Sequence, residues 1–249
     1  DLQTYQFELR RNARWHNVFP VNGRHVTPND VVFSFRRLMS ENSPAAGLLV
    51  GVTAISVVDD WTVQIELQGA DADLPSRLAN GHAKVVAPEA VEVNGDLKEG
   101  PVIGTGPWKW KDDSRASGPK FQAYPNYYEL GLPRTEQLTI EVIPDGHTRL
   151  TVLQVGRADI ARVSPSQWNT LKTQGFRSIL ATQMGTGALI ALNTSRPPFD
   201  KPQARRAFFL GHDPWEISQK AWQDQFQVGV GVPVVNSAGL LEKSELQSY

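Results

Sequence analysis

The chain has 249 residues, of which 40% are apolar and 20% charged, as is typical of a globular protein with one large domain or two smaller ones. A formal net charge of −1 argues against a nucleic-acid surface or a polybasic membrane surface. The absence of cysteine excludes thiolate metal ligands, a cysteine nucleophile and disulfides, and no apolar run approaches the roughly 20 residues that span a bilayer.

The N-terminal part of the chain predicts a strand, a helix and a hairpin. Residues 5–9 alternate between apolar and polar side chains, which indicates a half-buried strand. Thr27-Pro28-Asn29-Asp30 predicts the start of a helix over 28–40, because threonine can cap, proline suits the first helical position and Asp30 stands where a capping-box acid would. Thr53–Val58 and Trp61–Leu67 are rich in β-branched and aromatic residues and indicate a hairpin.

The middle of the chain predicts more strands. Glu92–Pro101 is charged and contains glycine, which is typical of a surface connection. Trp108–Lys111 and Phe121–Tyr124 indicate two strands.

A β-α-β unit is expected next. Leu138–Val142 alternates as a strand, Asp145 can cap a helix that ends at Gly156, and Ala158–Ala161 is expected to return as a short strand. This order predicts a parallel or mixed sheet with helices packed on it.

Helix starts dominate the C-terminal part. Ser164–Gln167 forms a capping box, and further helix starts are expected at Asp200 and Asp213. Ala188–Leu192 predicts a buried strand, and Gly229–Gly239 is typical of a loop, as if the chain stopped before a terminal element.

Five segments resemble the motifs of one family, in the same order and at similar spacing. They are Tyr5–Ser34, Gly104–Trp108 (GTGPW), Asn126–Tyr128 (NYY), Ile143–Asp159 (IPDGHTRLTVLQVGRAD) and Leu192–Ala207 (LNTSRPPFDKPQARRA). The family is extracellular solute-binding protein family 5, the oligopeptide-, dipeptide- and nickel-binding proteins of ABC importers. The first turn departs from the pattern, because Asn17-Val18 stands where the family has Asp-Gly.

The resemblance implies a mixed α/β fold like the type II periplasmic binding proteins, but incomplete. Family members are longer and close two lobes on a ligand, so we expect this chain to be a piece of a longer protein that covers mainly the first lobe. Residues 1–101 are then a subdomain inserted in that lobe, 102–192 its α/β core, and 193–249 the hinge and the truncated start of the second lobe.

The resemblance also implies two places on the wall of the ligand cleft. One is the loop Asn80–Lys84, where His82 or Lys84 could receive an anionic group; the alternative is that both are solvated loop residues. The other is Arg162, Val163 and Ser164, and ligands do gather at the carboxyl ends of parallel strands. Ser164 is equally suited to be only a helix cap.

The function implied is that of a substrate-binding component that captures peptides or a similar small solute and delivers it to the permease subunits of an ABC importer. The expected location is periplasmic or extracellular, with membrane contact only through the transporter or a lipid anchor outside this chain. The residues contain no nucleophile–base motif and no zinc-type histidine spacing, so we expect neither an enzyme nor a metal site, and no cofactor or nucleic acid. The alternative is the ligand-sensing domain of a transcription regulator with the same fold.

Overall fold

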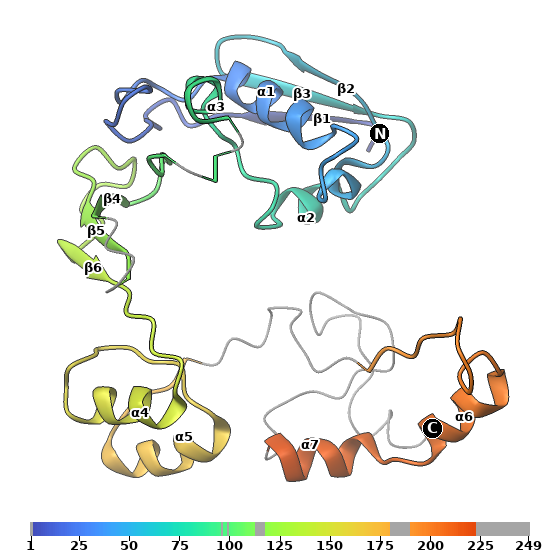
Figure 1. Ribbon diagram of the computed structural model, residues 1–249. Coiled ribbons are helices and arrows are strands. Elements are labelled where there is room, and N and C mark those ends of the chain that lie inside the picture. The colour runs from blue at the N-terminus through green and yellow to red at the C-terminus, as the bar shows by residue number, and fades with distance from the viewer. Residues whose placement is uncertain (1, 96, 99, 113–117, 180–189, 223–249) are drawn as a thin grey trace. The chain divides into compact units, whose positions relative to one another are not determined.

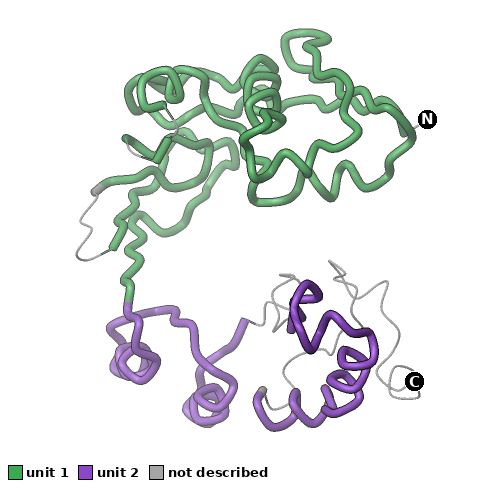
Figure 2. Tube along the Cα trace, turned by 45° about the vertical axis from the view of Figure 1, so that its right-hand side comes forward, with its two compact units in different colours: residues 1–142 green, residues 143–249 purple. Residues whose placement is uncertain are grey.

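The computed structural model describes all residues except 1, 96, 99, 113–117, 180–189 and 223–249 (Figure 1). It contains two compact units, residues 1–142 and 143–249 (Figure 2). This division differs from the expected boundaries, which fall after residue 101 within the first lobe and after residue 192 at the hinge, and which stay predictions.

The first unit is a small three-stranded sheet with helices, followed by a second three-stranded sheet. Its described elements are β1 (Thr4–Glu8), α1 (Pro28–Leu38), η1 (Ala46–Leu49), β2 (Val52–Val57), β3 (Thr62–Leu67), α2 (Leu74–Leu78), α3 (Pro88–Asn94), β4 (Trp108–Asp112), β5 (Lys120–Ala123) and β6 (Gln137–Thr139). The sheet orders are β1-β3-β2 and β4-β5-β6, and every pairing is antiparallel. The strand over 5–9, the hairpin and the two strands after residue 107 are therefore confirmed.

The core of the first unit lies between α1 and the β1-β3-β2 sheet. Ile65, in the central strand, stands opposite Tyr5 on one side and Ile55 on the other, so that their side chains share a face. Ile65 and Ile55 pack with Phe35 and Val31 of α1 in one buried cluster. The apolar stripe of α1 thus covers the alternating apolar face of the sheet, as the two periodicities predict.

The start of α1 confirms the predicted capping box. The backbone N–H of Thr27 donates to Asp30 Oδ2 at 2.9 Å, and Pro28 occupies the first helical turn. Asp30 is 1% exposed, and its carboxylate also accepts from Trp15 Nε1 and from two nitrogens of Arg24. The acid expected to cap a helix is therefore also the buried centre of a charged network.

Arg24 joins three segments of the first unit. Its guanidinium bonds to Asp30 at 2.7 Å and to Glu89, in the first turn of α3, at 2.6 Å. The two carboxylates raise the pKa of Arg24, and Arg24 lowers the pKa of Glu89. This pairing positions the start of α3.

The surface connection expected from Glu92 begins three residues later than predicted, because α3 runs to Asn94. Pro88 and the buried Ala90 favour a helix there.

His16 connects the loop Gly104–Pro107 to the rest of the first unit by hydrogen bonds. Its backbone N–H donates to Gly104 O, and its ring, only 4% exposed, lies between two backbone groups of the same loop. Gly106 O can only accept, so Nε2 carries the proton and donates at 3.0 Å, while Nδ1 accepts from Gly104 N at 3.3 Å. Burial lowers the pKa of His16, and the nearby Lys109 acts in the same direction.

The stability of the protein is expected to fall in mild acid through His16. Its pKa is lower in the folded state than the ordinary value of 6.5, so the contribution is complete above pH 6.5 and is lost as the pH falls from there toward the folded pKa. Urea unfolding at several pH values measures this effect, with His16→Gln as the control that cannot titrate. An equal loss of stability between pH 7 and pH 5 in both proteins would assign the effect to other groups.

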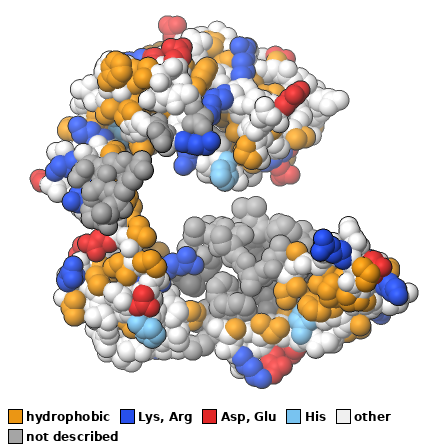
Figure 3. All heavy atoms as spheres, viewed as in Figure 1, with side chains coloured by type: hydrophobic (Ala, Val, Ile, Leu, Met, Phe, Trp, Pro, Cys, Tyr) orange, Lys and Arg blue, Asp and Glu red, His pale blue; other side chains and the backbone are white. Residues whose placement is uncertain are grey.

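The second unit is helical in its described part. Its elements are α4 (Gly146–Gln154), α5 (Pro165–Leu171), η2 (Lys172–Gln174), α6 (Pro202–Leu210) and α7 (Pro214–Trp222). Three of the predicted helix starts are confirmed: Asp145 accepts from Thr148 N, Ser164 from Gln167 N, and Asp213 from Trp215 N. The helix expected to start at Asp200 begins at Pro202 instead, with Lys201 as its N-cap. Apolar side chains gather over α6 (Figure 3), where Leu210 is 76% exposed.

The expected parallel or mixed sheet is wrong for the described residues, since the strand pairs there are all antiparallel. The strand expected over 138–142 ends at Thr139, and Val142 is 75% exposed. Residues 158–161 form no strand, because Ala158 N donates to Val152 O in the end of α4 and Ile160 is 85% exposed. A strand needs a neighbouring strand with which its backbone N–H and C=O groups can pair. Among the described residues, no strand pairs with residues 158–161.

Two other expectations fall wholly or partly on residues that the structure does not describe. The Gly229–Gly239 segment lies outside the described residues, as do the first two residues of the strand expected over 188–192. The described remainder of that segment forms no strand, and Ile190 is 50% exposed.

Candidate functional site

The loop between α2 and α3 carries the first pair of candidate side chains. His82 and Lys84 are both exposed, whereas Ala83 between them is only 9% exposed. This alternation turns both candidate side chains outward on the same loop. Exposed side chains of this kind can meet an anionic group without first losing a protein partner.

Two partly buried contacts fix the chain on either side of this loop. Downstream, the hydroxyl of Ser34 in α1 accepts from Val86 N at 2.8 Å and lies 3.0 Å from Val86 O. Upstream, Arg77 of α2 donates to Leu48 O at 2.9 Å and pairs with Asp71 at 2.6 Å. The hydrogen bond from Arg77 lowers the pKa of Asp71 below its ordinary value. The loop is thus a short exposed segment between two fixed ends.

The second candidate segment, Arg162–Ser164, precedes α5. Ser164 accepts from Gln167 N at 3.3 Å and its backbone N–H donates to Gln167 Oε1 at 2.9 Å, a complete capping box. The hydroxyl of Ser164 is therefore already engaged as a cap, which was one of its two expected roles. Arg162 is exposed and Val163 half-buried.

Arg149 of α4 holds the Arg162 backbone in place. Its Nη1 donates to Ile143 O at 2.6 Å and to Pro144 O at 2.8 Å, and its Nε donates to Arg162 O at 3.3 Å. Gln167 Nε2 adds a bond to Gly146 O at 2.9 Å. These contacts join the segment before α4 to the segment before α5.

The candidates fall into two groups. His82 and Lys84 lie together in the first unit, and Arg162, Val163 and Ser164 lie together in the second. Residues that support the two groups, chiefly Ser34, Arg77 and Arg149, had no predicted role. Arg149 could have been noticed within the Ile143–Asp159 motif, whereas the contact of Ser34 with Val86 spans 52 positions and leaves no local signal.

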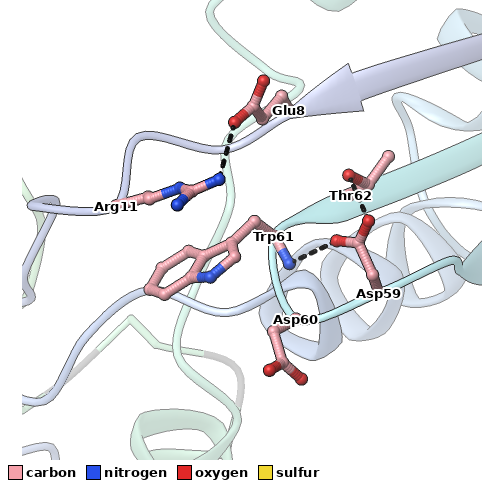
Figure 4. Close-up of a pocket in the computed structure, with 6 residues that line it drawn as sticks. All are labelled: Glu8, Arg11, Asp59, Asp60, Trp61 and Thr62. Carbon is pink, nitrogen blue, oxygen red and sulfur yellow. Dashed lines mark hydrogen bonds and ion pairs between the residues drawn. The ribbon is translucent and has the colours of Figure 1, made fainter.

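An open pocket of about 500 Å³ lies at the end of the β2–β3 hairpin (Figure 4). Arg11 pairs with Glu8 at 3.5 Å and stands over the ring of Trp61, 6.0 Å from its centroid. Asp59 accepts from Trp61 N at 2.8 Å and from Thr62 Oγ1 at 3.1 Å, and the backbone bond to Trp61 is the main cause of its lowered pKa. Asp59 therefore acts as a turn residue of the β2–β3 connection.

The described residues contain no group of three histidine, aspartate or glutamate side chains arranged to hold a metal ion. Among the same residues, no helix combines the length and the apolar character needed to cross a membrane.

The fold and these motifs agree with one family. Residues 1–245 match the bacterial extracellular solute-binding proteins, family 5 (middle region), and the chain belongs to that family. The match covers nearly the whole chain and confirms the resemblance found in the five motifs.

Named relatives extend this assignment. The chain is 26% identical to heme-binding protein A of Haemophilus influenzae over 90% of its own length and 44% of the relative. It is also 26% identical to a probable di/tripeptide-binding protein 5 of Pseudomonas aeruginosa, over 93% of the chain and 48% of the relative. The chain thus spans less than half the length of these two relatives.

Solved structures show the same fold. NikZ of Campylobacter jejuni, in complex with Ni(L-His), matches with a TM-score of 0.75 at 21% identity, over 90% of this chain and 45% of NikZ. DppA of Helicobacter pylori, a periplasmic binding protein associated with an ABC transporter and solved with the peptide STSA, matches with a TM-score of 0.73 at 20% identity over 90% and 48%. The expected mixed α/β fold of the periplasmic-binding-protein type, incomplete in this chain, is therefore confirmed.

Proposed function

We propose that this chain is part of the substrate-binding component of an ABC importer, which captures peptides or a similar small solute outside the cytoplasmic membrane. The observation that carries the proposal is the family match over residues 1–245. Relatives with peptide-, glutathione- and heme-binding names support a small solute as the ligand. These binding-protein names, together with the ABC-transporter association of the Helicobacter pylori protein, support a receptor over the sensing domain of a transcription regulator.

The proposed solute contacts are two segments, each taken within its own unit: His82 and Lys84 in the first unit, and Arg162, Val163 and Ser164 in the second. Three of these five residues carry or can carry positive charge, which suits a carboxylate or another anionic group on the solute. The site binds and releases its solute without making or breaking bonds. The partners proposed are the permease subunits of the importer, and the location is periplasmic or extracellular.

Calorimetric titration of the complete gene product tests this proposal. The probes are trialanine, reduced glutathione, hemin and nickel–histidine, and we expect at least one to bind with a micromolar or lower Kd. This 249-residue chain alone is expected to bind the same probe at least about tenfold more weakly, because a solute held by one wall keeps part of its surface in water. Equal affinity for the two proteins, or no binding to any probe, would contradict the proposal.

A further inference from the structure

Asn80 forms a turn inside the loop that carries His82 and Lys84. Its side-chain Oδ1 accepts from His82 N at 2.9 Å, and its backbone carbonyl accepts from Ala83 N at 2.9 Å. The first contact is an Asx-turn and the second closes a β-turn over the same residues. Both bonds end on the short stretch of chain from which the side chains of His82 and Lys84 project.

The turn matters because the residue that follows Asn80 is Gly81. Glycine has the widest choice of backbone conformations, so it leaves the direction of the following residues poorly determined. A Cβ added at Gly81 would meet no atom within 4 Å, so packing does not restrain this position either. The side chain of Asn80 is exposed, yet it supplies a restraint that Gly81 and its surroundings do not.

The ends of the loop are already fixed by other residues. Ser34 holds Val86 from α1, and Arg77 ties α2 to the η1 segment through Leu48 O. With both ends held, the remaining freedom of the loop lies at residues 80–84. The Asn80 turn removes much of this freedom before any solute arrives.

We propose that Asn80 is a positioning residue of the solute site: by holding the His82 N–H through its side-chain oxygen, it fixes the directions in which His82 and Lys84 project. The inference rests on the proposed function, in which these two side chains contact the solute. A loop that is ordered in advance loses less conformational entropy on binding, so the affinity for the solute rises. Asn80 itself need not touch the solute.

Three variants of the complete gene product separate this role from a general effect on folding. Asn80→Ala removes the acceptor, Asn80→Asp keeps an oxygen at the same place, and Gly81→Ala restricts the backbone where the space is open. Titrations use whichever of trialanine, reduced glutathione, hemin or nickel–histidine binds the unaltered protein most tightly. Amide hydrogen exchange at His82, followed by NMR without solute, reports the turn itself.

Asn80→Ala is expected to bind about fivefold more weakly, which corresponds to the loss of one hydrogen bond. Its His82 amide should exchange faster, while its thermal unfolding temperature should change little because the side chain is exposed. Asn80→Asp should keep slow exchange and most of the affinity, and Gly81→Ala should bind as tightly as the unaltered protein or more tightly.

Unchanged affinity in Asn80→Ala, with the unaltered protein binding normally, would overturn the positioning role alone. Failure of the unaltered protein to bind any probe would overturn the proposed function and this role with it.

Discussion

Replacing Asp30 with alanine is expected to lower the free energy of unfolding by about 3–5 kcal/mol, the usual effect of removing one partner from a buried ion pair. Asp30 is 1% exposed, and its carboxylate accepts from Arg24, Trp15 Nε1 and Thr27 N. Without it, the guanidinium of Arg24 keeps only Glu89 as an ionic partner, and the indole N–H of Trp15 is left buried without an acceptor. Urea unfolding followed by tryptophan fluorescence measures the difference.

A matched control comes from an exposed ion pair of the same unit. The Glu8 and Arg11 side chains are 68% and 72% exposed, so Glu8→Gln is expected to change the stability by no more than about 0.5 kcal/mol. A loss of less than about 1 kcal/mol in Asp30→Ala would mean that the network around Arg24 is not a source of stability.

Replacing Arg149 with alanine is expected to destabilise the second unit by about 2 kcal/mol and to weaken binding of the solute by the complete gene product. Arg149 donates to the carbonyls of Ile143, Pro144 and Arg162, and so joins the segment before α4 to the segment before α5. Its loss frees the backbone of Arg162, next to the proposed contacts at Val163 and Ser164. Thermal unfolding of this chain and calorimetry of the complete gene product measure the two effects.

Two substitutions act as controls for Arg149. Arg149→Lys keeps the charge but not the planar fork of donors, so its effect should be intermediate. Arg157→Ala removes an exposed charge just after α4 and should leave both stability and affinity nearly unchanged. If Arg157→Ala matched Arg149→Ala in both measurements, the loss would reflect net charge rather than the bridge.

The sequence predicted the local features of this fold well because their causes lie within a few residues. The capping boxes at Thr27 and Ser164 and the cap at Asp145 each depend on contacts three residues apart. The β2–β3 hairpin likewise depends on two adjacent apolar runs. Such signals survive in a single sequence because the residue types and their spacing are enough to specify them.

The long-range features could not be predicted in the same way. The bond from Arg24 to Glu89 spans 65 positions, and no spacing rule connects them. The prediction of a strand at 158–161 was wrong because a strand forms only beside a partner strand. The pattern of apolar residues within one segment does not show whether such a partner exists. The site residues came from family resemblance, whereas the supporting turn at Asn80 could have been read from the Asn-Gly pair at 80–81, a common turn signal.

Photoaffinity labelling of the complete gene product tests the central claim most directly. A tripeptide with a photoreactive side chain is bound and irradiated, and the labelled residues are located by mass spectrometry. Labelling within 80–84 or 162–164, suppressed by excess unlabelled tripeptide, is the result that the two proposed solute-contacting segments predict. Suppressible labelling that avoids both segments and falls instead on another surface, such as the open pocket around Trp61, would contradict it.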